Sequence, residues 1–242
     1  MRVSLFATCL GDQFFAEACA DAVRLLRHLG VEVDSPPGQT CCGQPAYNAG
    51  FLREARAMAR HTIEVFSDAE RVVLPSGSCA AMLGSYYLDL FEEGSEDAAL
   101  AADLAERTRE LSAFIAADLG VTDLGKGLGG MRVAYHHGCH ALRELGLGDE
   151  AVALLCGSGA EVVNWEAAEE CCGFGGLFAV RLPEVSVAMA DRKIDTLPDP
   201  DVLTSADGGC LLQLAGRLRE RGSVLPVRHL ASLLWEGVAG RG

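Results

Sequence analysis

Basic residues are few in this chain of 242 residues, and lysine is almost absent. Lysine and arginine together number 20 against 34 aspartates and glutamates, which gives a net charge of −14, and the only lysines are Lys126 and Lys193. Binding of nucleic acid needs a basic face that displaces counterions from phosphates. We therefore expect no nucleic-acid partner, and we interpret the preference for arginine as a compositional bias.

Long apolar runs are missing as well. No uninterrupted apolar stretch approaches the ~20 residues that span a bilayer, so we expect no direct membrane insertion. The first residues lead directly into a predicted strand, and their apolar run is too short for a signal peptide. We therefore expect a cytoplasmic protein.

Motifs for hydride chemistry are absent too. We find no complete dinucleotide fingerprint, no P-loop and no flavin motif, so the chain is not expected to take hydride from a substrate itself. The sequence identifies no catalytic residue. It also has no Cys-x-x-Cys pair, the spacing that structural zinc sites commonly use.

Cysteine, in contrast, is abundant, with ten residues. Eight of them form two sets with the same order: a single cysteine, a Cys-Cys-Gly run and another single cysteine. The sets are Cys9, Cys41, Cys42, Cys79 and Cys139, Cys171, Cys172, Cys210. Matching spacings of this kind indicate an internal repeat. In a reducing cytosol this density points to metal or redox chemistry rather than disulfides. We interpret the other two, Cys19 and Cys156, as packing residues.

Strands and helices alternate along both halves, as in a parallel sheet with right-handed crossovers. We predict strands at 2–8, 31–34, 71–74, 131–135, 161–164, 202–204 and 224–227. We predict helices at 15–29, 51–66, 80–119, 150–156, 183–197, 211–221 and 230–236. The fold is thus predicted to be α/β, with two duplicated Rossmann-like parallel-sheet domains at 1–124 and 131–242 and a glycine-rich linker at 125–130. The cysteines follow the carboxyl ends of strands, which share one edge of a parallel sheet, so distant cysteines can converge there.

Four thiolates in loops that can shield sulfide from water favour an iron–sulfur cluster, with zinc as the alternative. Neighbouring glycines allow backbone amides to approach cluster sulfurs. Histidines flank Cys139, and His136 is either a cluster ligand or proton donor, or a loop residue hydrogen-bonded to the backbone. The predicted cofactor-binding residues besides the cysteines are Gly43, Gly173, Gly175, Gly176 and His136. The second set has more glycine and histidine, so we expect it to bind its cluster more firmly and at a higher potential.

The repeated cysteine pattern resembles the cysteine-rich CCG domain family, to which the CCG-containing component of heterodisulfide reductase belongs. More closely, four segments are similar to the lactate utilisation A branch of that family: residues 8–12, 41–46, 76–79 and 171–176. The similarity covers nearly the whole chain. It implies one or two iron–sulfur clusters, of the [4Fe-4S] type, bound by the eight cysteines. It also implies an electron-transfer subunit in a cytoplasmic system that oxidises L-lactate to pyruvate, with a ferredoxin-like lactate utilisation protein B and a lactate utilisation protein C as partners.

One departure from the family bears on function. In the heterodisulfide reductase branch a fifth cysteine follows the last one of each set, but this chain has Met82 and Gln213 there. We therefore do not carry over disulfide cleavage at a non-cubane cluster. Two alternatives stay open: a metal-stabilised structural or assembly module of a redox complex, and a thiol/disulfide-reductase-like CCG component.

Overall fold

The computed structural model describes residues 1–240 and contains two four-stranded sheets. In spatial order, the first sheet consists of β2 (Glu32–Asp34), β1 (Arg2–Leu5), β3 (Val72–Leu74) and β4 (Thr108–Glu110). The second sheet consists of β6 (Glu161–Val162), β5 (Arg132–Tyr135), β7 (Val202–Ser205) and β8 (Val227–His229). All neighbouring strands in both sheets are parallel. The identical strand order confirms the predicted duplicated α/β fold.

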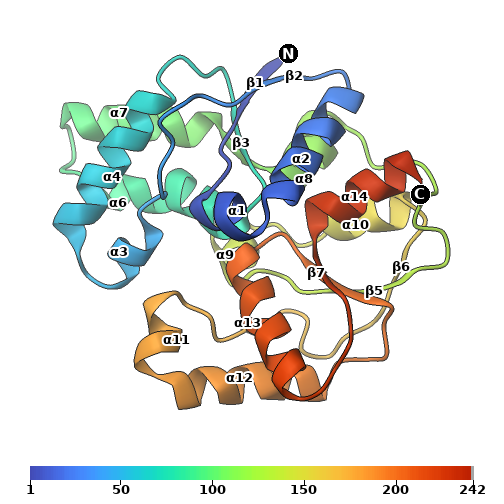
Figure 1. Ribbon diagram of the computed structural model, residues 1–242. Coiled ribbons are helices and arrows are strands. Elements are labelled where there is room, and N and C mark those ends of the chain that lie inside the picture. Colours follow the sequence, from blue (N-terminus) through green and yellow to red (C-terminus); the bar gives the residue numbers. More distant parts are fainter. Residues whose placement is uncertain (241–242) are drawn as a thin grey trace.

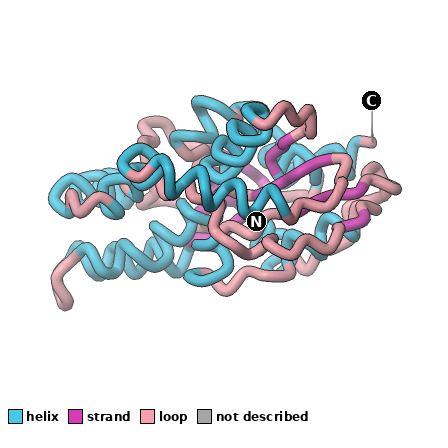
Figure 2. The backbone as a smooth tube through the Cα atoms, turned by 90° about the horizontal axis from the view of Figure 1, so that it is seen from below, coloured by secondary structure: helices cyan, strands magenta, loops and turns pink. Residues whose placement is uncertain are grey.

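Helices surround the strands, which lie in the interior (Figure 2). The first half contains α1 (Cys9–Phe14), α2 (Ala16–His28), α3 (Gln44–Asn48), α4 (Leu52–Val65), α5 (Gly77–Ala81), α6 (Tyr87–Leu90), α7 (Glu96–Arg107), α8 (Leu111–Ala113) and the π-helical turns η1 (Met82–Tyr86) and η2 (Phe114–Asp118). The second half contains α9 (Cys139–Glu144), α10 (Glu150–Gly157), α11 (Leu177–Arg181), α12 (Pro183–Asp195), α13 (Gly208–Glu220) and α14 (Leu230–Ala239). Within residues 1–240, no helix combines the length and the apolar character needed to cross a bilayer.

The prediction of helix over residues 80–119 was wrong at residues 108–110, where β4 interrupts the helices. This strand has three residues at the edge of the first sheet, of which Thr108 and Glu110 are buried. Three residues are too few to establish a strand-like alternation against the helical pattern on either side. The short helices α1, α3, α9 and α11 were not predicted.

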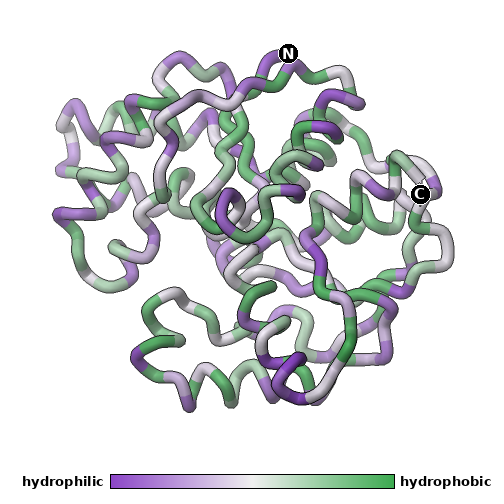
Figure 3. The backbone as a smooth tube through the Cα atoms, in the orientation of Figure 1, coloured by the Kyte–Doolittle hydropathy of each residue, from purple (hydrophilic) through white to green (hydrophobic). Residues whose placement is uncertain are grey.

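The two halves share one hydrophobic core. Helix α2 packs against α14 (Figure 1), and apolar residues of both halves, including Leu25, Phe114, Leu154 and Leu233, belong to a single buried cluster. Hydrophobic residues concentrate in the middle of the molecule (Figure 3). Because burial of one such side chain stabilises the fold by about 1.5–3 kcal/mol, this shared cluster holds the halves in fixed contact.

The glycine-rich segment 125–130, predicted as a linker, is bound to the second half. The amide of Gly127 donates to the carbonyl oxygen of Gly237 at 3.0 Å, and that of Leu128 donates to Ser158 at 3.0 Å. The side chain of Leu128 is fully buried. The boundary at this segment remains our proposal for where the duplicated units meet.

The halves also exchange contacts near the cysteines. Helix α5 packs against α9, where a Cβ on Gly77 would lie 2.6 Å from that of Ala141. In the same way α13 packs against α1, where a Cβ on Gly208 would lie 3.1 Å from the ring of Phe15. In each half, the helix that carries the last cysteine of the set therefore lies against the helix that carries the first cysteine of the other set. This arrangement brings the carboxyl ends of both sheets together.

Candidate metal centre

The first cysteine set converges from three loops of the first half. Cys9 begins α1 after β1, the pair Cys41 and Cys42 follows β2, and Cys79 lies in α5 after β3. The sulfurs of Cys42 and Cys79 are 3.3 Å apart, and Cys9 lies close enough to Cys41 for the two thiols to shift each other's pKa. Residues far apart in the sequence thus meet because their strands are parallel neighbours in the order β2–β1–β3.

The second set repeats this arrangement. Cys139 begins α9 after β5, Cys171 and Cys172 lie in the loop after β6, and Cys210 lies in the first turn of α13. Cys139 lies close enough to Cys171, and Cys172 close enough to Cys210, for each thiol to raise the pKa of its neighbour or lower it. The same order of sulfur contacts, from single cysteine to pair to single cysteine, therefore occurs in both halves.

Both sets open into one cavity of about 200 Å³ between the halves. The eight cysteines of the two sets, Cys9, Cys41, Cys42, Cys79, Cys139, Cys171, Cys172 and Cys210, all line it. Gly175, Gly176 and His140 contribute to the same wall, whereas Gly43, Gly173 and His136 do not. The sequence predicted two separate sites, and the shared cavity is a relationship that only the packing of the halves reveals.

Crowding of the thiols changes their protonation. Hydrogen bonds from Cys42 and Cys9 lower the pKa of the Cys41 thiol, while hydrogen bonding to Cys41 raises the pKa of Cys9 and of Cys42. In the second set, hydrogen bonds from Cys139 and Cys172 likewise lower the pKa of Cys171. Four thiolates this close repel one another, and a bound cation relieves that repulsion.

Glycine is required after each cysteine pair. Gly43 has φ 89° and Gly173 has φ 84°, a left-handed conformation that side chains rarely adopt. A Cβ on Gly173 would also lie 2.5 Å from the carbonyl oxygen of Ser186 in α12. The tight turn lets the amide of Gly173 donate to the sulfur of Cys171 at 3.4 Å, and that of Phe174 donate to Cys172 at 3.4 Å.

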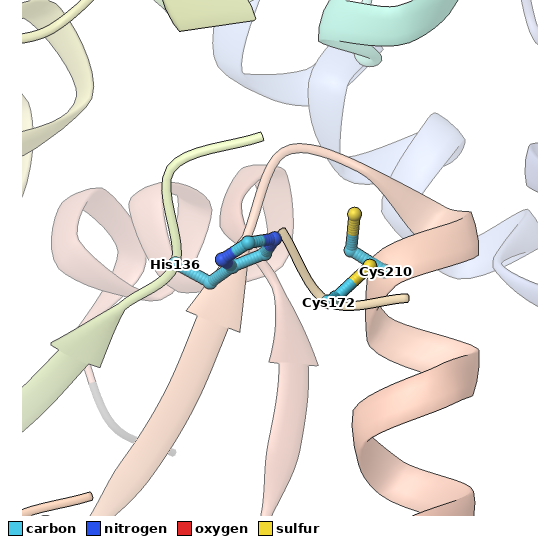
Figure 4. Close-up of side chains that lie close together, drawn as sticks. All are labelled: His136, Cys172 and Cys210. Carbon is cyan, nitrogen blue, oxygen red and sulfur yellow. The ribbon is translucent and has the colours of Figure 1, made fainter. Parts of the chain in front are cut away.

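His136 brings an imidazole to the second set from the end of β5 (Figure 4). Its Nδ1 lies 3.2 Å from the carbonyl oxygen of Ala168, so this nitrogen carries the proton and Nε2 has the free lone pair. Nε2 is buried without a hydrogen-bond partner, and a ligand atom of His136 lies within 4.8 Å of the sulfurs of Cys172 and Cys210. Burial lowers the pKa of His136 to about 3, so the ring is neutral. Metal-ligating histidines are usually neutral and held in this way, with the second ring nitrogen donating to a carbonyl or carboxylate oxygen.

The first half has no equivalent of this imidazole, because Phe6 occupies the corresponding position at the end of β1. Phe6 is buried and stacks on Phe66 with ring centroids 5.3 Å apart. The two sets are therefore chemically different despite their common geometry.

Cys19, Cys156, His137 and His140 do not belong to either cysteine set. The thiol of Cys19 donates to the carbonyl oxygen of Ala7 at 3.3 Å, at the edge of the cavity. Cys156 is exposed, so its interpretation as a packing residue was wrong. His140 lies beside Cys139, with Nδ1 3.6 Å from its sulfur, and His137 packs its ring on Tyr135.

Several polar residues around the cavity were not identified from the sequence. Asp207, Ser76 and Ser78 form a buried hydrogen-bonded group between the halves, and Nε2 of His229 donates to the carbonyl oxygen of Pro75 at 3.1 Å. Lys193 and Trp165 are buried behind the second set. Lys193 had one available signal, since it is one of two lysines in an arginine-rich chain.

The residues present fit a thiolate-bound metal group. Each set supplies four sulfurs, amide donors lie beside the cysteine pair of the second set, and the unpartnered Nε2 of His136 adds a further donor there. This donor set is typical of iron–sulfur and zinc sites.

Comparison with known proteins agrees with the duplicated architecture. The profile of the cysteine-rich domain family CCG matches twice, at residues 3–84 and 133–215. The chain is 41% identical over 241 residues to lactate utilization protein A 2 of Bacillus cereus (strain 03BB102), covering 98% of this chain and 99% of the relative. It is 44% identical over 237 residues to lactate utilization protein A of Geobacillus sp. (strain WCH70), covering 97% and 99%. The chain therefore belongs to the lactate utilization protein A family of CCG cysteine-rich domain proteins.

Proposed function

We propose that the chain is an iron–sulfur electron-transfer subunit of a cytoplasmic system that oxidises L-lactate to pyruvate. The observation that carries this proposal is the meeting of two complete cysteine sets at one cavity between the halves. The ligands would be the four cysteines of each set, with His136 as an additional donor to the second. The names of the relatives support lactate as the substrate of the system.

Bound iron–sulfur clusters would supply one-electron acceptance and donation. The chain's own residues would hold the thiolates in place, offer amide donors at Gly173 and Phe174, and limit access of water. Oxidation of lactate to pyruvate releases two electrons and two protons. Two adjacent one-electron sites suit the two electrons, while removal of hydrogen from lactate would belong to a partner with hydride chemistry.

We propose a ferredoxin-like lactate utilisation protein B and a lactate utilisation protein C as those partners. The residues after the last cysteine of each set support electron transfer over disulfide cleavage. Met82 is buried, and the side chain of Gln213 donates to Ser186 at 2.8 Å, so neither position provides a fifth thiol.

The test is reduction by substrate. The anaerobically purified chain, mixed with its two partners, should lose visible absorbance when L-lactate is added, and it should not do so when either partner is omitted. If the double variant with both Cys42→Ser and Cys172→Ser still assembles with the partners and supports lactate oxidation at the wild-type rate, the chain is an assembly module and the proposal is wrong.

A further inference from the structure

Lys193 is a fully buried cation in a chain that has almost no lysine. It lies in α12, with no exposed surface, and its ammonium donates to the carbonyl oxygens of Ala167 and Ala168, the latter at 3.0 Å. The ammonium also lies 4.1 Å from the centroid of the Trp165 ring. These contacts fix its position on the loop that leads to Cys171 and Cys172.

This cation has no carboxylate partner among residues 1–240, where no acidic oxygen lies within 4.0 Å of its nitrogen. Glu170, which directly precedes the cysteine pair, is already paired with Arg192 at 2.8 Å on the surface. Burial lowers the pKa of Lys193 to about 8, which leaves it charged at neutral pH, and negative charge at Cys172 or Cys210 would oppose this decrease. A buried charge is costly unless an opposite charge compensates it.

The first half has no such cation. Met58 in α4 and Met189 in α12 occupy the same place against Gly43 and Gly173, and the residues four positions further along these helices are Thr62 and Lys193. Thr62 is buried and uncharged. The second half therefore has Lys193 where the first half has Thr62, and it has His136 where the first half has Phe6.

We propose that Lys193 is the fixed counter-charge of an iron–sulfur cluster at the second cysteine set, and that it raises the reduction potential of this site above that of the first. The inference rests on the proposed function, since it requires that the second set binds a cluster. One-electron reduction adds one negative charge to a cluster, and a fixed ammonium nearby stabilises the reduced form more than the oxidised form. The effect is strong because the ammonium is excluded from water.

The test is a redox titration of Lys193→Gln, monitored by electron paramagnetic resonance. Glutamine can still donate to the carbonyl oxygens of Ala167 and Ala168, so the variant removes the charge and keeps a donor. We expect one of two signals to become at least tenfold harder to reduce, which is ~59 mV for a one-electron couple, while the other signal stays unchanged. Lys126→Gln, at an exposed lysine, and Thr62→Val, at the equivalent first-half position, should leave the higher-potential signal unchanged.

A second measurement separates electrostatics from structural support. In the metal-free protein the buried ammonium lacks its anion, so Lys193→Met should unfold at the same or a higher denaturant concentration than wild type, while the metal-loaded variant should lose iron faster than wild type. Equal destabilisation of both forms, or unchanged potentials in Lys193→Gln, would overturn the inference. A wild-type protein without iron would instead refute the proposed function itself.

Discussion

The carboxylate of Asp207, in the second half, accepts a hydrogen bond from the backbone amide of Ser78, in the first half, at 3.1 Å. Asp207 directly precedes α13, yet its side chain makes no cap bond to that helix and instead satisfies the start of α5. It also accepts from the hydroxyl of Ser76 at 3.2 Å, and that oxygen in turn accepts from the amide of Cys79. One carboxylate therefore joins the helices that carry Cys79 and Cys210.

Asp207→Asn should weaken this connection between the halves. The amide nitrogen of asparagine would face donors, and one charge-assisted acceptor would be lost, so we expect the free energy of unfolding to fall by about 2 kcal/mol. Urea unfolding under anaerobic conditions measures this. The matched control is Asp68→Asn at an exposed position. If Asp207→Asn has the urea midpoint of the control, the carboxylate does not hold the halves together.

Glu110 should make stability depend on pH. Its buried carboxyl group caps α8 and has one oxygen without a partner, and burial raises its pKa to about 7. Asp207 raises it further, and the carboxyl of Glu150 and the hydroxyl-bearing Tyr135 line the same small cavity. Because the folded state holds this proton at a pH where the unfolded state has released it, the contribution of Glu110 to stability is greatest below about pH 4.5 and is lost as the pH rises to about 7.

The corresponding variant is Glu110→Gln, which keeps an acceptor for the amides of Ser112 and Ala113. Relative to this variant, the wild type should lose about 3 kcal/mol of unfolding free energy between pH 4.5 and pH 7.5, as a shift of this size implies. Glu106→Gln, at an exposed glutamate, should retain the wild-type pH profile. Parallel pH profiles of wild type and Glu110→Gln would contradict the prediction.

Gly173→Ala should disrupt the loop of Cys171 and Cys172 more than conformational strain alone would. A methyl group there must adopt a positive φ, which costs about 1–2 kcal/mol, and it would also collide with the carbonyl oxygen of Ser186. Gly30→Ala is the control, since Gly30 has φ 79° but nothing within 4 Å of its Cβ position and does not line the cavity. Iron content and the thermal unfolding temperature should both decrease more in Gly173→Ala than in the control. Equal losses in the two variants would mean that the contact with α12 is unimportant.

His136→Phe should make the second site resemble the first, where Phe6 stands. If Nε2 of His136 contacts the bound group, the electron paramagnetic resonance signal of one cluster should change while the other is preserved. His28→Phe, at an exposed histidine that does not line the cavity, is a control for loss of a histidine outside either site. A spectrum identical to wild type would show that His136 only supports the loop at Ala168.

The convergence of Cys42 and Cys79 could be predicted from sequence, because cysteines after neighbouring parallel strands share one edge of the sheet. The strand β4 could not, because three residues between helical segments leave no periodic signal. The contact of Asp207 with Ser78 depends on how the halves dock, which no local pattern records. The burial of Lys193 could not be predicted either, because a lysine in an amphipathic helix is normally solvated, and only the packing of this side chain on Trp165 reveals its burial.

The most direct test of the account is the metal and sulfide content of the anaerobically purified protein. We predict a brown protein with iron and acid-labile sulfide in equal amounts, with iron lost partly in Cys42→Ser and partly in Cys172→Ser, because each set would hold its own cluster. Wild-type protein that is colourless, free of iron and sulfide, and loaded with stoichiometric zinc would contradict it.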